Sequence, residues 1–175
     1  MERLVVLSDL WGKTKNDWWV NYQPFLAPAI QIQFIDIAEW AEIPEDILSK
    51  KKRHAYFMQG GIEKVVKRMQ DELNTPVTIF AVSMGGTIAW KYGQKTGLLK
   101  HLIAVSATRL RYETNKPNGK IELYYGAKDQ YLPSKDWFQS MKILQNFVGH
   151  ANHQLYAQKE FAKILSKRLN LIVNN

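Results

Sequence analysis

Short runs of apolar residues recur along the chain, and longer stretches with apolar positions at helical spacing separate several of them. A short, uninterrupted apolar run is typical of a strand that is buried on both faces, as in a parallel sheet. The pattern therefore predicts a central sheet of six strands, over residues 4–7, 30–37, 77–82, 102–105, 121–125 and 143–148.

Amphipathic stretches predict helices between and after these strands. Apolar residues recur at helical spacing over residues 62–73, with lysines and glutamates on the opposite face. Residues 87–96 predict a helix that Gly97 closes, and residues 161–169 predict a C-terminal helix. Alternating strands and helices indicate the α/β class, here a three-layer α/β/α sandwich with a mostly parallel six-stranded sheet. The length favours a single domain over residues 1–175.

Composition and charge narrow the function classes. The chain has no cysteine, which excludes disulfides, thiolate metal sites and a cysteine nucleophile. Its net charge is +8, but the basic residues are scattered apart from residues 50–53 and the last helix. No nucleic-acid motif accompanies them, so we expect a solvated basic surface and no nucleic-acid partner. The first apolar run is too short for a signal peptide or a membrane span, and we expect a cytoplasmic protein.

Two serines follow Ala-Val at the ends of predicted strands, Ser83 and Ser106. Ligands of parallel sheets bind at the carboxyl ends of the strands, so both serines lie where chemistry is expected. A nucleophilic serine on a tight strand-to-helix turn requires small residues two positions before and after it. Ser83 has Ala81 and Gly85 there, whereas Ser106 is followed at that distance by the β-branched Thr108.

We therefore interpret Ser83 as a nucleophile and Ser106 as a strand-end residue. The structural alternative for Ser83 is a helix N-cap, a position that serine favours. Two glycines in the first turn are an unusual choice for a simple cap, because glycine weakens helices.

Three segments resemble the α/β-hydrolase superfamily. Residues 81–85, AVSMG, resemble the nucleophile elbow, which usually reads Gly-x-Ser-x-Gly. Residues 124–133, YYGAKDQYLP, resemble the loop that carries the catalytic acid, and residues 147–155, FVGHANHQL, resemble the loop of the catalytic histidine. They occur in the superfamily's chain order, and the resemblance covers nearly the whole chain. Residues 107–120 are polar and too few for a lid, so the resemblance implies a lidless member.

The resemblance implies that Ser83 is the nucleophile and Asp129 the acid that orients the base. Asp129 could instead be a simple turn residue, since Gly-x-x-Asp is a common turn composition. Asp36 and Glu113 remain alternative acids, because the acid occupies different strands in different members of the superfamily.

The base is one of two histidines in the same loop. The spacing Gly-x-x-His selects His153, and the variant with glycine directly before histidine selects His150. We predict His153. The two could also form half of a metal site, but no third ligand is evident at a suitable spacing, so neither a metal nor a cofactor is expected. His54 and His101 are interpreted as surface or packing residues.

The resemblance also implies an oxyanion hole made of two backbone amides. One is the amide of Met84, directly after the nucleophile. The other belongs to the first loop, where Gly12 is kept but the usual His-Gly pair is replaced by Asp9-Leu10. By analogy the donor is the amide of Trp11, with Leu10 as the alternative.

The predicted function is hydrolysis of a carboxylic ester or thioester through an acyl-enzyme. Two alternatives stay open: a weak or inactive hydrolase fold that acts as a binding module, and an esterase for acyl groups on an acidic acyl carrier protein. Trp18 and Trp19, or residues 40–58, either cover the site or pack in the core.

Overall fold

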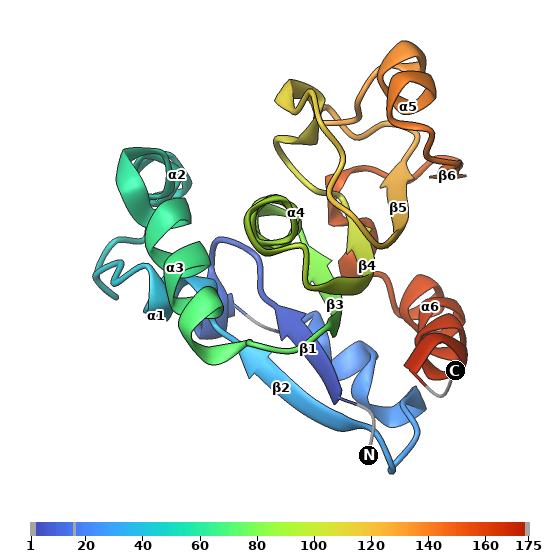
Figure 1. Ribbon diagram of the computed structural model, residues 1–175, viewed down its shortest axis with the longest axis horizontal. Coiled ribbons are helices and arrows are strands. Elements are labelled where there is room, and N and C mark those ends of the chain that lie inside the picture. The colour runs from blue at the N-terminus through green and yellow to red at the C-terminus, as the bar shows by residue number, and fades with distance from the viewer. Residues whose placement is uncertain (1–2, 16, 174–175) are drawn as a thin grey trace.

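A six-stranded parallel sheet forms the centre of the protein, seen in the computed structural model of Figure 1, which describes residues 3–15 and 17–173. Its strand order is β2-β1-β3-β4-β5-β6, and every neighbouring pair is parallel. All six predicted strands are confirmed, with shifted ends: β1 (Arg3–Leu7), β2 (Gln31–Ile35), β3 (Val77–Val82), β4 (Leu99–Val105), β5 (Lys120–Gly126) and β6 (Gln145–Val148).

The strand order creates a switch point between β1 and β3. The chain begins at β1, crosses to the edge at β2, returns to the other side of β1 at β3 and then proceeds outward to β6. Connections leaving β1 and β3 therefore diverge to opposite sides, and in parallel sheets ligands bind at the carboxyl ends of the strands beside such a switch point. The loops after β1 and β3 are the two that the sequence assigns to the oxyanion hole and the nucleophile.

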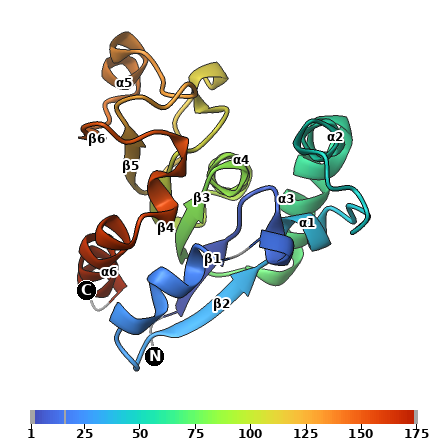
Figure 2. The same cartoon turned by 180° about the vertical axis from the view of Figure 1, so that it is seen from behind.

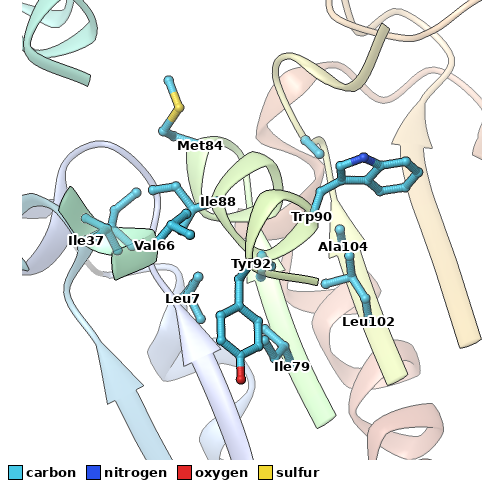
Figure 3. Close-up of a cluster of buried hydrophobic side chains, with 14 of the residues drawn as sticks. Leu7, Ile37, Val66, Ile79, Met84, Ile88, Trp90, Tyr92, Leu102 and Ala104 are labelled. Carbon is cyan, nitrogen blue, oxygen red and sulfur yellow. The ribbon is translucent and has the colours of Figure 1, made fainter. Parts of the chain in front are cut away.

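Most of the helices cover one face of the sheet. Buried side chains of α1, α3, α4 and α5 pack with β1, β3, β4 and β5 in one hydrophobic cluster, part of which Figure 3 shows around Ile88 and Trp90 of α4. The α-helices on this side are α1 (Ile37–Trp40), α2 (Lys50–Tyr56), α3 (Ile62–Glu72), α4 (Met84–Thr96) and α5 (Lys135–Met141).

The other face is covered by α6 (Lys159–Val173) and by two short 3-10 helices, η2 (Trp19–Asn21) and η3 (Gln23–Phe25). In Figure 2, α6 lies beside the blue N-terminal segment that contains η2 and η3. Trp18 is only 2% exposed, and its ring lies 6.1 Å from that of Phe80 on β3 and 5.8 Å from that of Tyr156. Trp18 and Trp19 therefore pack in the core instead of covering a site, and Trp40 is buried in the opposite cluster.

Some elements differ from the prediction. Helix α4 begins at Met84, three residues before the predicted start, so its first turn follows Ser83 directly. Helices α2 and α5, each seven residues long, were not predicted, because two turns give too little periodicity to recognise. Between β4 and β5 the only regular element is the 3-10 helix η5 (Leu110–Tyr112), in agreement with the absence of a lid there. Within the described residues, no helix is both long and apolar enough to span a membrane.

The contact between α4 and β1 makes a stability prediction for Gly85. A Cβ atom built there would lie 2.4 Å from the carbonyl oxygen of Ser8 and 2.9 Å from the Cβ of Leu7. Gly85→Ala should lower the free energy of unfolding in urea by about 1–3 kcal/mol, because overpacking outweighs alanine's better helix propensity.

The matched control is Gly149→Ala, since a Cβ at Gly149 meets nothing within 4 Å. It should change the free energy of unfolding by less than about 0.5 kcal/mol. Equal stability of the two variants would show that α4 is not packed against β1 as closely as described.

Candidate active site

Ser83 occupies a strained turn between β3 and α4. Its backbone angles are φ 51° and ψ −119°, a region that residues with a side chain rarely adopt. The turn brings α4 so close to its neighbours that a Cβ at Gly86 would lie 2.7 Å from that of Ala107. The hydroxyl of Ser83 does not cap α4. The N-cap alternative is therefore not what the structure shows.

The side chains of Ser83, His153 and Asp129 form one continuous hydrogen-bonded row. Ser83 Oγ lies 3.0 Å from His153 Nε2, and His153 Nδ1 lies 3.0 Å from Asp129 Oδ2 and 3.2 Å from Oδ1. A proton on Nδ1 satisfies the carboxylate and leaves the lone pair of Nε2 for the serine hydroxyl, so the hydrogen-bond pattern assigns this tautomer. Asp129 is 5% exposed, which shields its interaction with the imidazole from water.

Two adjoining loops place the acid and the histidine. Asp129 closes a turn after β5, in which its amide donates to the carbonyl of Gly126 at 3.0 Å. His153 begins the 3-10 helix η6 (His153–Ala157), which Asn152 caps through its side chain. The loops are joined by the amide of Lys128, which donates to the carbonyl of Ala151 at 2.9 Å. Both side chains are thus held by local backbone geometry on neighbouring strand ends.

The alternative acids have other partners. Asp36 caps α1 by accepting from the amides of Ala38 and Glu39 at 2.9 and 3.0 Å. Glu113 forms an ion pair with Lys91 at 2.9 Å. Neither contacts a histidine in the described part of the chain, so the structure brings only Asp129 to His153.

The second serine and the other histidines lie outside this row. Ser106 also has a positive φ, 54°, but its hydroxyl is buried and has no partner among the described residues. His150 is exposed, and no hydrogen bond links it to Ser83 or Asp129 within those residues. His101 is a packing residue bonded to Glu122 at 3.1 Å, and His54 is partly exposed on α2.

The first loop holds a buried carboxylate that sequence reasoning did not single out. Asp9 is 4% exposed; its Oδ1 accepts from the amide of Trp11 at 2.9 Å and its Oδ2 from the hydroxyl of Tyr156 at 3.1 Å. Burial raises the pKa of Asp9 to about 6, although these two hydrogen bonds oppose the rise. An acidic residue directly after an apolar strand, in place of the usual His-Gly, was the available signal.

The predicted oxyanion donors differ in whether their amides already have a hydrogen-bond acceptor. The amide of Trp11 is engaged by Asp9, whereas those of Leu10 and Met84 donate no hydrogen bond within the described residues. Met84 begins α4 directly after Ser83, where helix amides point outward without acceptors.

Aromatic rings and basic side chains surround the histidine. The ring of Tyr131 lies 4.8 Å from that of His153, and the guanidinium of Arg111 and the ammonium of Lys50 lie 5.3 and 5.8 Å from the Tyr131 ring. We refer to Lys50 and Arg111 as the basic rim.

Within residues 3–15 and 17–173, no three His, Asp or Glu side chains are grouped so as to hold a metal ion.

Comparison with known proteins identifies the fold. No protein-family model and no curated protein matches the chain. Among solved structures, a protein named as a dienelactone hydrolase from Klebsiella pneumoniae aligns with a TM-score of 0.77 at 14% identity, over 100% of this chain and 87% of that one.

Two further solved structures are similar. A monoacylglycerol lipase from Paleococcus ferrophilus aligns with a TM-score of 0.66 at 11% identity, over 98% of this chain and 94% of that one. Est1E from Butyrivibrio proteoclasticus aligns with a TM-score of 0.63 at 12% identity, over 99% and 89%. The predicted resemblance in fold is confirmed: the chain has the fold of the α/β-hydrolase superfamily.

Proposed function

We propose that this protein is a serine hydrolase that cleaves a carboxylic ester or thioester. The observation that carries the proposal is the unbroken row from Ser83 Oγ through His153 to the buried carboxylate of Asp129. A serine hydroxyl becomes a good nucleophile only when a base removes its proton and a third group orients that base, and this row supplies both requirements.

The reaction proceeds in two stages. Ser83 Oγ attacks the carbonyl carbon of the substrate while His153 Nε2 takes the hydroxyl proton, and Asp129 stabilises the resulting imidazolium. The tetrahedral intermediate collapses, and His153 gives the proton to the leaving alcohol or thiol, which leaves an acyl group on Ser83. A water molecule then attacks the acyl-enzyme with His153 again as base, which releases the carboxylic acid and restores Ser83.

Negative charge on the carbonyl oxygen requires two hydrogen-bond donors. The amide of Met84 is the first, because it follows the nucleophile and has no acceptor of its own among the described residues. The second comes from the first loop, from Trp11 or Leu10. The altered sequence of this loop is what favours the alternative of an inactive binding module, since a poorly formed hole would leave the triad residues without their electrostatic support.

A narrower version of the function concerns substrates carried by an acidic acyl carrier protein. The basic rim, Lys50 and Arg111, lies around the ring that contacts His153, and the chain as a whole has a net charge of +8. Opposite charges on a docking partner would accelerate association with this face.

Covalent labelling tests the nucleophile and the base. A fluorophosphonate probe should label the wild-type protein on Ser83, and Ser83→Ala should abolish the labelling. His153→Ala should slow it by at least about 100-fold, because general base catalysis contributes 10²–10⁴-fold. The matched controls Ser106→Ala and His150→Ala should label at the wild-type rate. An unlabelled wild-type protein would instead support the binding module.

The pH dependence of hydrolysis tests the histidine base. With short p-nitrophenyl esters assayed from about pH 5 to 8, kcat/KM should rise with pH, because the imidazole must be unprotonated before it can accept a proton from Ser83. A profile that is flat across this range, measured at constant ionic strength, would contradict a histidine base.

Salt dependence tests the carrier-protein version. With an acyl group attached to an acidic carrier protein, kcat/KM should fall at least about 10-fold between 20 and 300 mM NaCl, since salt screens attraction between surface charges. Free p-nitrophenyl esters should show no such loss. In the double variant Lys50→Gln/Arg111→Gln the two substrates should respond alike. Equal salt dependence of the two substrates in the wild type would exclude electrostatic docking.

A further inference from the structure

The Asp9 carboxylate links two segments that meet beside the reacting groups. One oxygen accepts from the amide of Trp11 in the first loop, and the other accepts from the hydroxyl of Tyr156, which lies in η6 three residues after His153. The ring of Tyr156 in turn lies edge-on to that of His153 at 6.0 Å. Asp9 therefore joins the loop that supplies an oxyanion donor to the element that carries the base.

Apart from the amide of Leu10, most backbone polar groups of the first loop have a hydrogen-bond partner. The carbonyl of Asp9 accepts from the amide of Gly12 at 3.2 Å and from the hydroxyl of Ser8 at 3.1 Å. The carbonyl of Leu10 accepts from the buried guanidinium of Arg53 at 3.4 Å. Of the amides of Leu10, Trp11 and Gly12, only that of Leu10 has no acceptor in the described part of the chain.

The orientation of that free amide follows from peptide geometry. In a trans peptide the N–H of Leu10 points opposite to the carbonyl of Asp9, because the group is planar. This carbonyl is directed into the turn by Gly12 and Ser8, so the N–H of Leu10 points out of the turn. The loop thus presents one unpaired donor, while its neighbour Trp11 is occupied by Asp9.

We propose that Asp9 is a positioning residue that selects the amide of Leu10, not that of Trp11, as the first-loop oxyanion donor. It does so by binding the Trp11 amide and by anchoring the loop to Tyr156. This inference rests on the proposed hydrolase function and names the part of the site that replaces the usual His-Gly pair. Both carboxylate oxygens accept hydrogen bonds, which partly offset the negative charge of Asp9.

The ionised carboxylate of Asp9 only accepts hydrogen bonds, whereas protonation turns one of its oxygens into a donor and so disturbs this pair of bonds. The charged and titratable groups around it are His153 and Tyr156 in η6, Arg53 in α2, which reaches the carbonyl of Leu10, and Asp36, which lies against Gly12. Burial raises the pKa of Asp9 to about 6, so protonation of Asp9 disturbs the loop as the pH falls through this value, in addition to protonation of the base. Two protonations then reduce activity on the acidic side.

The raised pKa of Asp9 also predicts how the stability of the protein depends on pH. The folded protein binds a proton on Asp9 between about pH 4 and 6 that the unfolded chain releases, so this group contributes stability at low pH that is lost as the pH rises through about 6. Asp9→Asn removes the buried charge. At pH 8 the melting temperature of the variant should therefore equal or exceed that of the wild type. The difference between the two melting temperatures should shrink towards pH 4.

The experiment compares the wild type, Asp9→Asn, Tyr156→Phe and the control Tyr92→Phe. Tyr92 also donates a buried hydroxyl to a backbone carbonyl, that of Leu73 at 2.7 Å, just before β3 begins and thus at the opposite end of the sheet. With p-nitrophenyl esters at pH 8, Asp9→Asn should lower kcat/KM roughly 10- to 100-fold, mainly through kcat, because it weakens an oxyanion donor. Tyr156→Phe should lower it by a smaller factor and Tyr92→Phe by less than about twofold.

The pH dependence of kcat/KM at low pH distinguishes the positioning role of Asp9 from a purely structural role, which would leave this dependence unchanged. A plot of log kcat/KM against pH should approach a slope of two in the wild type and a slope of one in Asp9→Asn. If the wild type labels with fluorophosphonate but Asp9→Asn keeps the wild-type kcat/KM and slope, the positioning role is wrong and the hydrolase stands. If the wild type does not label, the proposed function fails and this inference falls with it.

Discussion

A serine with φ 51° and ψ −119° joins β3 to α4, and this strained backbone determines where several other groups must lie. Strain at one residue persists only where the surroundings enforce it. Here Gly85 and Gly86 allow α4 to lie against the ends of β1 and β4, at distances that no side chain would permit. The same close approach brings Ser8, where the first loop begins, against Gly85, two residues after Ser83. Gly85 and Gly86 therefore determine where the first loop and the end of β4 lie, as well as permitting the turn at Ser83.

A positive φ at a strand end is not by itself the mark of a nucleophile. Ser83 and Ser106 end neighbouring parallel strands and have nearly equal φ values, 51° and 54°. A helix begins directly after Ser83, whereas after Ser106 the chain continues without one, and the amide of Thr108 donates back to the carbonyl of Ser83 at 3.3 Å. The segment that follows Ser106 therefore supports the turn that carries Ser83. The β-branched Thr108, which excluded Ser106 at the level of sequence, is consistent with this supporting role.

The features predicted from sequence are those that a local pattern encodes. Continuous apolar runs gave the six strands, because parallel strands are buried on both faces. Two of the three long helices showed apolar residues at helical spacing, and the third was predicted as a helix that Gly97 closes. Ser83, Asp129 and His153 were found because each lies in a short motif after a strand. Strand ends were predicted less accurately. At β4 the polar residues Lys100 and His101 interrupt the apolar run, so the first three residues of the strand fell outside the predicted range.

What the sequence could not predict depends on contacts between distant segments. Asp9 and Tyr156 are 147 residues apart, and neither lies in a recognisable motif that would indicate their hydrogen bond. The role of Trp18 and Trp19 was ambiguous for the same reason. The sequence does not show where an aromatic pair packs, and only their contacts on the sheet face that carries Phe80 show that they belong to the core. Composition gave the charge of the basic rim but not its place, because Lys50 and Arg111 meet only at the ring of Tyr131.

The buried Asp9 is an unfavourable choice for stability alone. An ionised carboxylate loses hydration when it is buried, and its raised pKa records that the two hydrogen bonds do not fully compensate. An asparagine would fill the same space without the charge. Arg53, itself almost fully buried, holds the other side of the same loop through the carbonyl of Leu10. Two buried charged side chains thus bind the backbone of one short loop, although burying a charge costs hydration free energy. Buried charges that fix a loop in this way are expected where an amide must be held still for binding of a negatively charged group.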